Sequence, residues 1–152
     1  MGPVAVTGRK EPYSWGPKPI HTGRRPGKEQ ALSYESINLA AKLRRIPDLW
    51  SPRIVGELNG QHVKLAKAKG EFVWHHHENE DELFLVLDGT LRLEFRDGAV
   101  TLGPGELYIV PRGVEHRPVA SDEVHLLLFE PVSTLNTGNV RNERTVEHPR
   151  RI

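Results

Sequence analysis

The spacing of hydrophobic residues along this chain changes once, near Trp50. Between Ser36 and Arg45, apolar residues recur at the intervals that place side chains on one face of a helix. Pro47 follows, and a proline ends such a pattern because it lacks the backbone donor that a continuing helix needs. After Trp50, short apolar runs alternate with turn residues, which is typical of an all-β domain. The pattern therefore predicts one short helix followed by a β domain.

Turn signals divide the β domain into strands. Asn59-Gly60, Asp88-Gly89 and Asp97-Gly98 tolerate the positive φ angles of tight turns, so each predicts a hairpin. Gly103-Pro104-Gly105 and Pro111-Arg112-Gly113 are further breaks. The result is about eight strands, which suggests a jelly roll or small barrel. The expected strands are Ile54–Leu58, His62–Ala66, Leu83–Leu87, Leu91–Phe95, Val100–Leu102, Leu107–Val110, a strand around His116–Val119, and Val124–Phe129.

Polar segments flank the expected domain. Residues 1–32 are rich in Pro, Gly, Arg and Lys without periodicity, which predicts a flexible basic arm. A nucleic-acid-binding arm is the less favoured alternative, because its charges are scattered among prolines. The short helical segment is assigned to residues 33–49 and the barrel to residues 50–132. Residues 133–152 form a polar C-terminal tail with no fold of its own, lying along the barrel or contributing to a dimer contact.

Composition narrows the partners and the chemistry. The net charge is +1 with both signs interspersed, so we expect neither nucleic acid nor an anionic membrane as a partner. Without an apolar run of roughly 18 residues or a secretory signal, we expect a soluble, cytoplasmic protein. The chain has no cysteine, so a metal site here must use imidazole and carboxylate ligands.

One group of histidines has the spacing of a metal site. Alternate side chains of a strand share a face, so His75 and His77 are expected to point inward while His76 points away. Glu82 opens the following strand, and His116 begins a later one that a closed barrel returns to the first. We therefore expect these two histidines, Glu82 and His116 to bind one ion.

At these residues the chain resembles the cupins. The first cupin motif is Gly, five residues, His-x-His, three or four residues, Glu, six residues, Gly. It corresponds here to Gly70, His75, His77, Glu82 and Gly89, with the first interval one residue short. The second motif is Gly, five residues, Pro-x-Gly, two residues, His, three residues, Asn. It corresponds to Gly105, Pro111, Gly113 and His116, and Ala120 stands where the family has Asn.

The resemblance covers roughly residues 54–130. It implies an all-β cupin fold, the double-stranded β-helix or jelly-roll barrel, with a short N-terminal helix and flexible termini. The whole chain resembles small single-domain proteins of the cupin 2 type, some of them mannose-6-phosphate isomerase-like. Three imidazoles and one carboxylate suit Fe, Mn, Ni, Zn or Cu rather than Ca²⁺ or Mg²⁺. Such a ligand set leaves one or two positions open for substrate.

Strand parity also predicts the pocket and an oligomer. If Glu82 faces inward, Phe84 and Val86 do so too, and Leu83, Leu85 and Leu87 face outward. The outward leucines need a cover from a second layer, the helix or a second subunit, and we expect a homodimer. The largely apolar lining suits a small organic ligand that chelates the metal through oxygen atoms. No basic cluster for a phosphosugar points inward: Arg92, Arg96, Arg112 and Arg117 occupy outward or turn positions.

Two classes of function remain open. The favoured one is a metal-dependent enzyme of oxygenase or isomerase type acting on a small organic molecule. The alternative is a non-catalytic module that binds a small molecule or a metal. No catalytic residue is assigned, although Glu115 and Tyr108 are candidate bases. Of the other histidines, His125 is expected to stop short of the pocket, and His21, His62 and His148 to be exposed.

Overall fold

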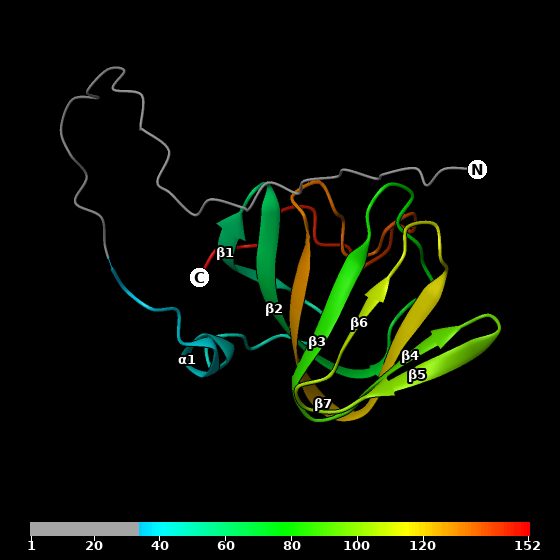
Figure 1. The fold of residues 1–152 in the computed structure, drawn as a ribbon, viewed down its shortest axis with the longest axis horizontal. Helices are drawn as coiled ribbons and strands as arrows, with labels where there is room; N and C mark the ends of the chain where they lie inside the picture. Colours follow the sequence, from blue (N-terminus) through cyan, green and yellow to red (C-terminus); the bar gives the residue numbers. More distant parts are fainter. Residues whose placement is uncertain (1–33) are drawn as a thin grey trace, which may run out of the picture. The chain divides into compact units, whose positions relative to one another are not determined.

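The computed structural model describes residues 34–152, which form one helix and seven strands (Figure 1). The arm expected over residues 1–32 and His21 lie outside the described residues. The elements are α1 (Leu39–Leu43), β1 (Arg53–Leu58), β2 (Gln61–Glu71), β3 (Glu82–Asp88), β4 (Leu91–Phe95), β5 (Gly98–Leu102), β6 (Leu107–Val110) and β7 (His116–Pro131). Within residues 34–152, α1 is the single helix, and its five residues are far too few to cross a bilayer.

The long strand β7 organises the sheet. The strand order is β1-β2-β7-β3-β6, and every pairing is antiparallel. β3 pairs with the second half of β7, β4 pairs with its first half, and β5 pairs with β4. The sequence predicted two strands around His116–Val119 and Val124–Phe129, but one strand of 16 residues joins them. That continuity explains why seven strands form where about eight were expected.

Asp88-Gly89 is not a hairpin turn, contrary to expectation. β3 and β4 each pair with β7 and not with each other, so the chain turns a corner here and continues along the same partner. Asn59-Gly60 does close a hairpin, with Leu58 opposite Gln61, and the hairpin expected at Asp97-Gly98 forms one residue earlier, at Arg96-Asp97, with Phe95 opposite Gly98. Gly60 and Gly89 both have a positive φ angle, yet one stands in a hairpin and the other at a corner, so the sequence signal alone could not separate the two.

Gly89 and Gly60 provide a matched test of this corner. Both have positive φ angles, 81° and 75°. A Cβ on Gly89 would lie 2.8 Å from the backbone oxygen of Glu123, whereas a Cβ on Gly60 would have no other heavy atom within 4 Å. Gly60→Ala is expected to cost about 1 kcal/mol of unfolding free energy through backbone strain alone. Gly89→Ala is expected to cost about 1–3 kcal/mol more, because β7 must shift. Urea denaturation measures both, and equal losses would contradict the close approach.

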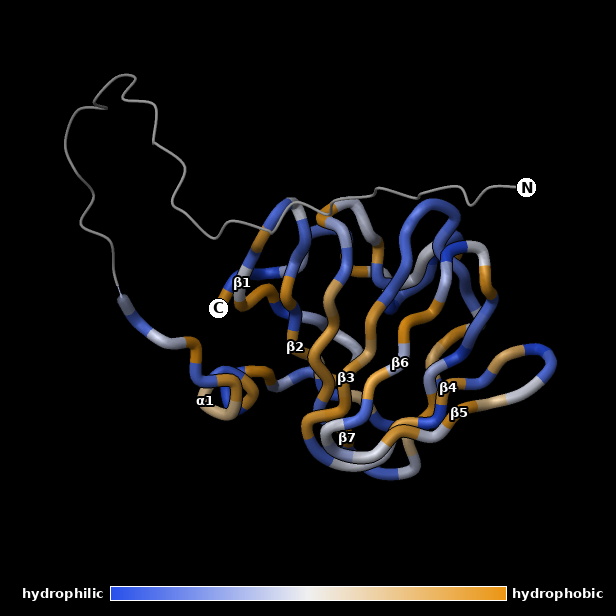
Figure 2. The backbone as a smooth tube through the Cα atoms, viewed as in Figure 1, coloured by the Kyte–Doolittle hydropathy of each residue, from blue (hydrophilic) through white to orange (hydrophobic). Residues whose placement is uncertain are grey.

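The inner face of the sheet carries the main core. Phe84 and Val86 are buried as strand parity predicted, beside Leu91, Leu93 and Leu126. Figure 2 shows hydrophobic residues concentrated along the strands and hydrophilic ones at the tip of the β4–β5 hairpin. Because β3 alternates strictly between buried and half-buried residues, its first residue, Glu82, also faces the interior.

A second apolar cluster covers part of the outer face. Leu43 and Ile46, in and just after α1, pack with Leu65 of β2 and with the outward residue Leu87. Of the three covers considered for the outward leucines, the helical segment therefore supplies one. The helix is shorter than the Ser36–Arg45 pattern suggested, because the Asn38 side chain accepts a hydrogen bond from the backbone of the first turn and caps it.

Candidate metal centre

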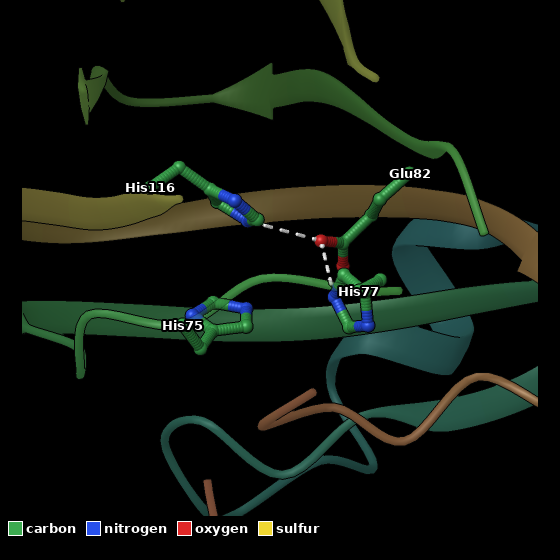
Figure 3. Close-up of side chains that lie close together, drawn as sticks. All are labelled: His75, His77, Glu82 and His116. Carbon is green, nitrogen blue, oxygen red and sulfur yellow. Dashed lines mark hydrogen bonds and ion pairs between the residues drawn. The ribbon is translucent and has the colours of Figure 1, made fainter. Parts of the chain in front are cut away.

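Four side chains meet inside the sheet: His75, His77, Glu82 and His116. Each offers one ligand atom, and these atoms all lie within 4.8 Å of one another (Figure 3). All four residues are at most 4% exposed. The sequence prediction that these residues face one point agrees with this geometry, and the structure places His76 outside the cluster, half-buried and paired with Glu78.

Backbone hydrogen bonds hold the cluster in register. His75 and His116 form an isolated antiparallel bridge, in which each backbone N–H donates to the other residue's carbonyl at 3.0 and 2.9 Å. The backbone N–H of Gly113 donates to the His77 carbonyl at 2.7 Å. Arg112 binds the carboxylate of Asp81 through its backbone N–H and its guanidinium. The Pro111-Arg112-Gly113 turn thus anchors both the histidine segment and the residue preceding Glu82.

The imidazole rings are oriented by carbonyl oxygens outside the cluster. Nδ1 of His75 lies 3.0 Å from the Val73 oxygen, and Nδ1 of His116 lies 3.0 Å from the Val114 oxygen. Since carbonyl oxygen only accepts, each Nδ1 carries the proton and donates it. This tautomer leaves the Nε2 lone pair of each ring for the centre of the cluster, as in histidines that ligate metals.

The carboxylate of Glu82 and the neighbouring imidazole rings shift one another's pKa. Oε2 of Glu82 lies 3.1 Å from Nε2 of His77 and 3.3 Å from Nε2 of His116. Burial alone would raise the pKa of Glu82, but the hydrogen bonds that His116 and His77 donate when their Nε2 atoms carry a proton outweigh it and hold this pKa well below its usual range. Burial opposes the protonation of His77, yet its hydrogen bond to Glu82 and the charge of that carboxylate raise the pKa of His77. Burial lowers the pKa of His75 to about 4, so this ring is neutral at pH 7.

This donor set fits a transition-metal ion. Ligand atoms about 2.1 Å from a common ion lie roughly 3–4.2 Å apart. The two carboxylate–imidazole separations of 3.1 and 3.3 Å fall in this range. Nitrogen lone pairs facing a buried carboxylate also require a positive charge between them, supplied by protons or by a metal ion. The residues present can therefore hold a divalent ion without rearrangement of the fold.

The raised pKa of His77 predicts that metal binding is coupled to proton release. Below that pKa the folded protein carries a proton on His77, and an ion must displace it to reach Nε2. The apparent affinity for Zn²⁺ is therefore expected to fall about tenfold per pH unit below the pKa of His77 for the one proton displaced. Calorimetry of Zn²⁺ binding in buffers of different ionisation enthalpy counts the released protons. An affinity that does not change between about pH 5 and 7 would contradict this coupling.

A cavity of about 40 Å³ lies beside the cluster. His75 and Glu82 line it together with apolar side chains, including Trp50, Phe72 and Phe84. The indole N–H of Trp50 donates to the Lys69 carbonyl and is therefore already satisfied. A mostly apolar hollow next to a polar anchor is the usual form of a small-molecule site.

Comparison with known proteins decides the family. The Cupin_2 family model, described as a cupin domain, matches residues 61–130. The Bacillus subtilis (strain 168) protein YdbB, described as uncharacterized, is 36% identical over 81 residues, which are 53% of this chain and 72% of that protein. The chain belongs to the cupin superfamily. The all-β cupin fold implied by the two motifs is thereby confirmed.

Two solved structures align with this cupin over most of their own length. A cupin-2 domain protein from Shewanella frigidimarina is 46% identical with a TM-score of 0.62, and the match covers 62% of this chain and 93% of that one. Protein NMB1881 from Neisseria meningitidis is 34% identical with a TM-score of 0.59, covering 64% of this chain and 99% of that one. The matched family region ends at residue 130, so the chain after β7 lies beyond it.

That last part of this cupin binds the histidine segment. We call residues 133–146 the C-terminal strap. The backbone N–H of Asn139 donates to the His76 carbonyl, and the His76 N–H donates to Oδ1 of Asn139, both at 3.0 Å. A Cβ on Gly138 would collide with the same carbonyl, so only glycine allows this approach. The sequence left open whether this polar tail lies along the barrel or at a dimer contact, and the bonds between Asn139 and His76 agree with the first alternative. The individual partners could not be predicted, since an Asn- and Gly-containing stretch has the same pattern whether packed or free.

A buried ion pair was also missed. Lys64 and Glu130 are each 1% exposed, with Nζ and Oε1 2.6 Å apart, on the inward faces of β2 and β7. Oε2 of Glu130 has no hydrogen-bond partner among the described residues. Burial and then the charge of Glu82 raise the pKa of Glu130 to about 7, although the nearby Lys64 opposes this. A lysine inside a β pattern gives no sign of its burial, because outward lysines have the same spacing.

The remaining candidates lie away from the cavity. Glu115 is paired with Arg96 on the surface, and Tyr108 packs against Phe95, so neither candidate base lines the hollow. His125 pairs with Glu123 and does not reach the cluster, as expected. His148 is exposed as expected. The expectation of an exposed His62 was wrong: its side chain is 14% exposed, because it stands beside the C-terminal residues that return to β1.

Proposed function

We propose that this cupin binds one divalent transition-metal ion through His75, His77, Glu82 and His116. The proposal is carried by three imidazole nitrogens and one carboxylate oxygen that converge in a buried pocket within 4.8 Å of one another. Fe, Mn, Ni, Zn and Cu all accept this donor set, whereas Ca²⁺ and Mg²⁺ prefer all-oxygen shells.

We infer further that the protein is a metal-dependent enzyme, of oxygenase or isomerase type, acting on a small organic molecule. A bound ion supplies Lewis-acid or oxygen-activating chemistry. The protein contributes four buried side chains, and Phe72 and Phe84 provide apolar walls of the hollow next to His75. This arrangement suits a substrate with an apolar body and oxygen atoms that reach the ion.

The alternative is a non-catalytic module that binds a small molecule or a metal. One observation favours it: among the described residues lining the cavity, only the proposed ligands His75 and Glu82 are acids or bases. A reaction that needs proton transfer would then depend on a ligand residue or on water. The fold leaves the choice open, since one architecture hosts many activities.

Metal analysis combined with a substrate screen separates the two. The purified protein is expected to contain about one equivalent of a transition metal per chain, by elemental analysis. Turnover of a chelating phenol, diketone or thiol under oxygen would support the enzyme, and tight binding without turnover would support the binding module. A protein that neither retains nor takes up a transition metal would rule out both forms of the proposal.

We also propose that the protein forms a homodimer through the outer face of the sheet. Leu107 and Ile109 of β6 are each 52% exposed, and Ile109 borders a groove of about 560 Å³ that Leu83 and Phe129 also line. An apolar strip of this kind is a typical protein contact surface. Size-exclusion chromatography with light scattering is expected to give twice the chain mass, and a monomer peak would contradict the proposal.

A further inference from the structure

The cavity beside the cluster has one polar side chain that the proposed metal site does not use. Asn136 lines the cavity together with His75 and Glu82. The other described lining residues are apolar or, like Trp50, have their polar atom already bonded. Asn136 belongs to the C-terminal strap, beyond the region that matches the cupin family model.

Two backbone partners fix the orientation of the Asn136 amide. Its Nδ2 donates to the Arg144 carbonyl, and its Oδ1 accepts from the Val146 N–H, both at 2.8 Å. Because one partner can only accept and the other can only donate, they decide which atom is nitrogen and which is oxygen. The amide nitrogen carries two hydrogens, so one of its N–H groups has no hydrogen-bond partner among the described residues.

The strap that carries Asn136 is held firmly against the site. Asn139 forms paired hydrogen bonds with His76, which lies between two of the proposed metal ligands. Within the strap, the Thr137 and Thr145 hydroxyls lie 2.9 Å apart, and Thr145 accepts from the Asn142 backbone. The position of Asn136 is therefore tied to the backbone that positions the histidines.

We propose that Asn136 is the specificity-determining residue of this site, and that its free N–H donates to an oxygen atom of a small carboxylate ligand held beside the metal. The cavity of about 40 Å³ has room for roughly three water positions, so a short carboxylate group fits within it. Asn136 recognises the oxygen, and the apolar walls accept the carbon of the ligand. The inference rests on the proposed metal site and adds the chemical class of its ligand.

Acetate binding to the full-length, cobalt-loaded protein tests this assignment. Asn136→Ala is expected to weaken acetate binding about tenfold or more, since a hydrogen bond to a charged group contributes about 1.5–3 kcal/mol. The cobalt content and the absorption spectrum without acetate are expected to stay unchanged, because Asn136 is not one of the proposed ligands. Titration followed through the cobalt absorption bands gives the affinities.

Thr145→Val is the matched control. It also removes two hydrogen bonds from the strap, but Thr145 does not line the cavity. Acetate affinity in this variant is expected to stay within about twofold of the wild type. Equal acetate affinity in the wild type and Asn136→Ala, or an equal loss in both variants, would overturn the assignment while leaving the metal site standing. A wild type that takes up no cobalt would overturn the metal site and the assignment together.

Discussion

Replacing His77 with alanine is expected to remove most of the bound metal. A structural zinc site of four ligands binds with about 10–16 kcal/mol, so one ligand accounts for about 3 kcal/mol, or roughly a hundredfold in affinity. His77 also holds the hydrogen bond that lowers the pKa of Glu82, so its loss disturbs a second proposed ligand. Competition titration of Zn²⁺ against a chromophoric chelator measures the change.

The control for this prediction is the neighbouring residue. His76→Ala changes a half-buried ring that faces away from the cluster and leaves its backbone bonds to Asn139 in place. Its metal affinity is expected to remain within about threefold of the wild type. Equal losses of metal affinity in His76→Ala and His77→Ala would contradict the assignment of His77 to the metal site and of His76 to the opposite face.

Lys64→Met is expected to destabilise the protein by about 3–5 kcal/mol at pH 8, because it leaves the Glu130 carboxylate buried without its cation. Urea denaturation measures the loss. The double variant Lys64→Met, Glu130→Leu removes both charges and is expected to recover most of it, since apolar residues often replace a buried ion pair at little cost.

The loss is also expected to depend on pH. Burial, followed by the charge of Glu82, already raises the pKa of Glu130 to about 7, and removal of Lys64 raises it further. Above about pH 4.3 the unfolded chain releases this proton while the folded variant keeps it, so stability falls as the pH rises through that window. The penalty is therefore expected to be smaller at pH 5 than at pH 8.

Lys67→Met provides the control for the ion pair. Lys67 lies on the same strand but on the outer face, 3.7 Å from an exposed carboxylate of Glu123. Loss of such a surface pair is expected to change stability by less than about 1 kcal/mol at either pH. Similar losses of unfolding free energy in Lys64→Met and Lys67→Met would show that the Lys64–Glu130 pair is not isolated from water.

The sequence was most informative where residue types and spacing are both restricted. The alternation around His75 and His77, the start of a strand at Glu82 and the turn before His116 together predicted four side chains that the structure brings within 4.8 Å of one another. The two histidines do face one point, as the alternation predicted, although β2 ends at Glu71, His75 forms only an isolated bridge and His77 lies outside the strands. The same parity correctly placed Phe84 and Val86 in the core.

The sequence was least informative about long-range partners. Nothing local distinguishes the corner at Gly89 from a hairpin, because the choice depends on the continuity of β7. Likewise, Lys64 is buried against Glu130, which lies 66 residues later in the chain. The strap is held by His76, which lies 63 residues before its partner Asn139. Such features follow from tertiary packing, which local pattern does not encode.

The central claim is that four residues from separate parts of the sequence hold one metal ion. A crystal structure of the metal-loaded protein, with anomalous diffraction measured on both sides of the metal's absorption edge, tests it most directly. The expected result is a single anomalous peak per chain, within bonding distance of His75, His77, Glu82 and His116. A fully loaded protein with its peak elsewhere, or with any of these four side chains turned away from the ion, would contradict the claim.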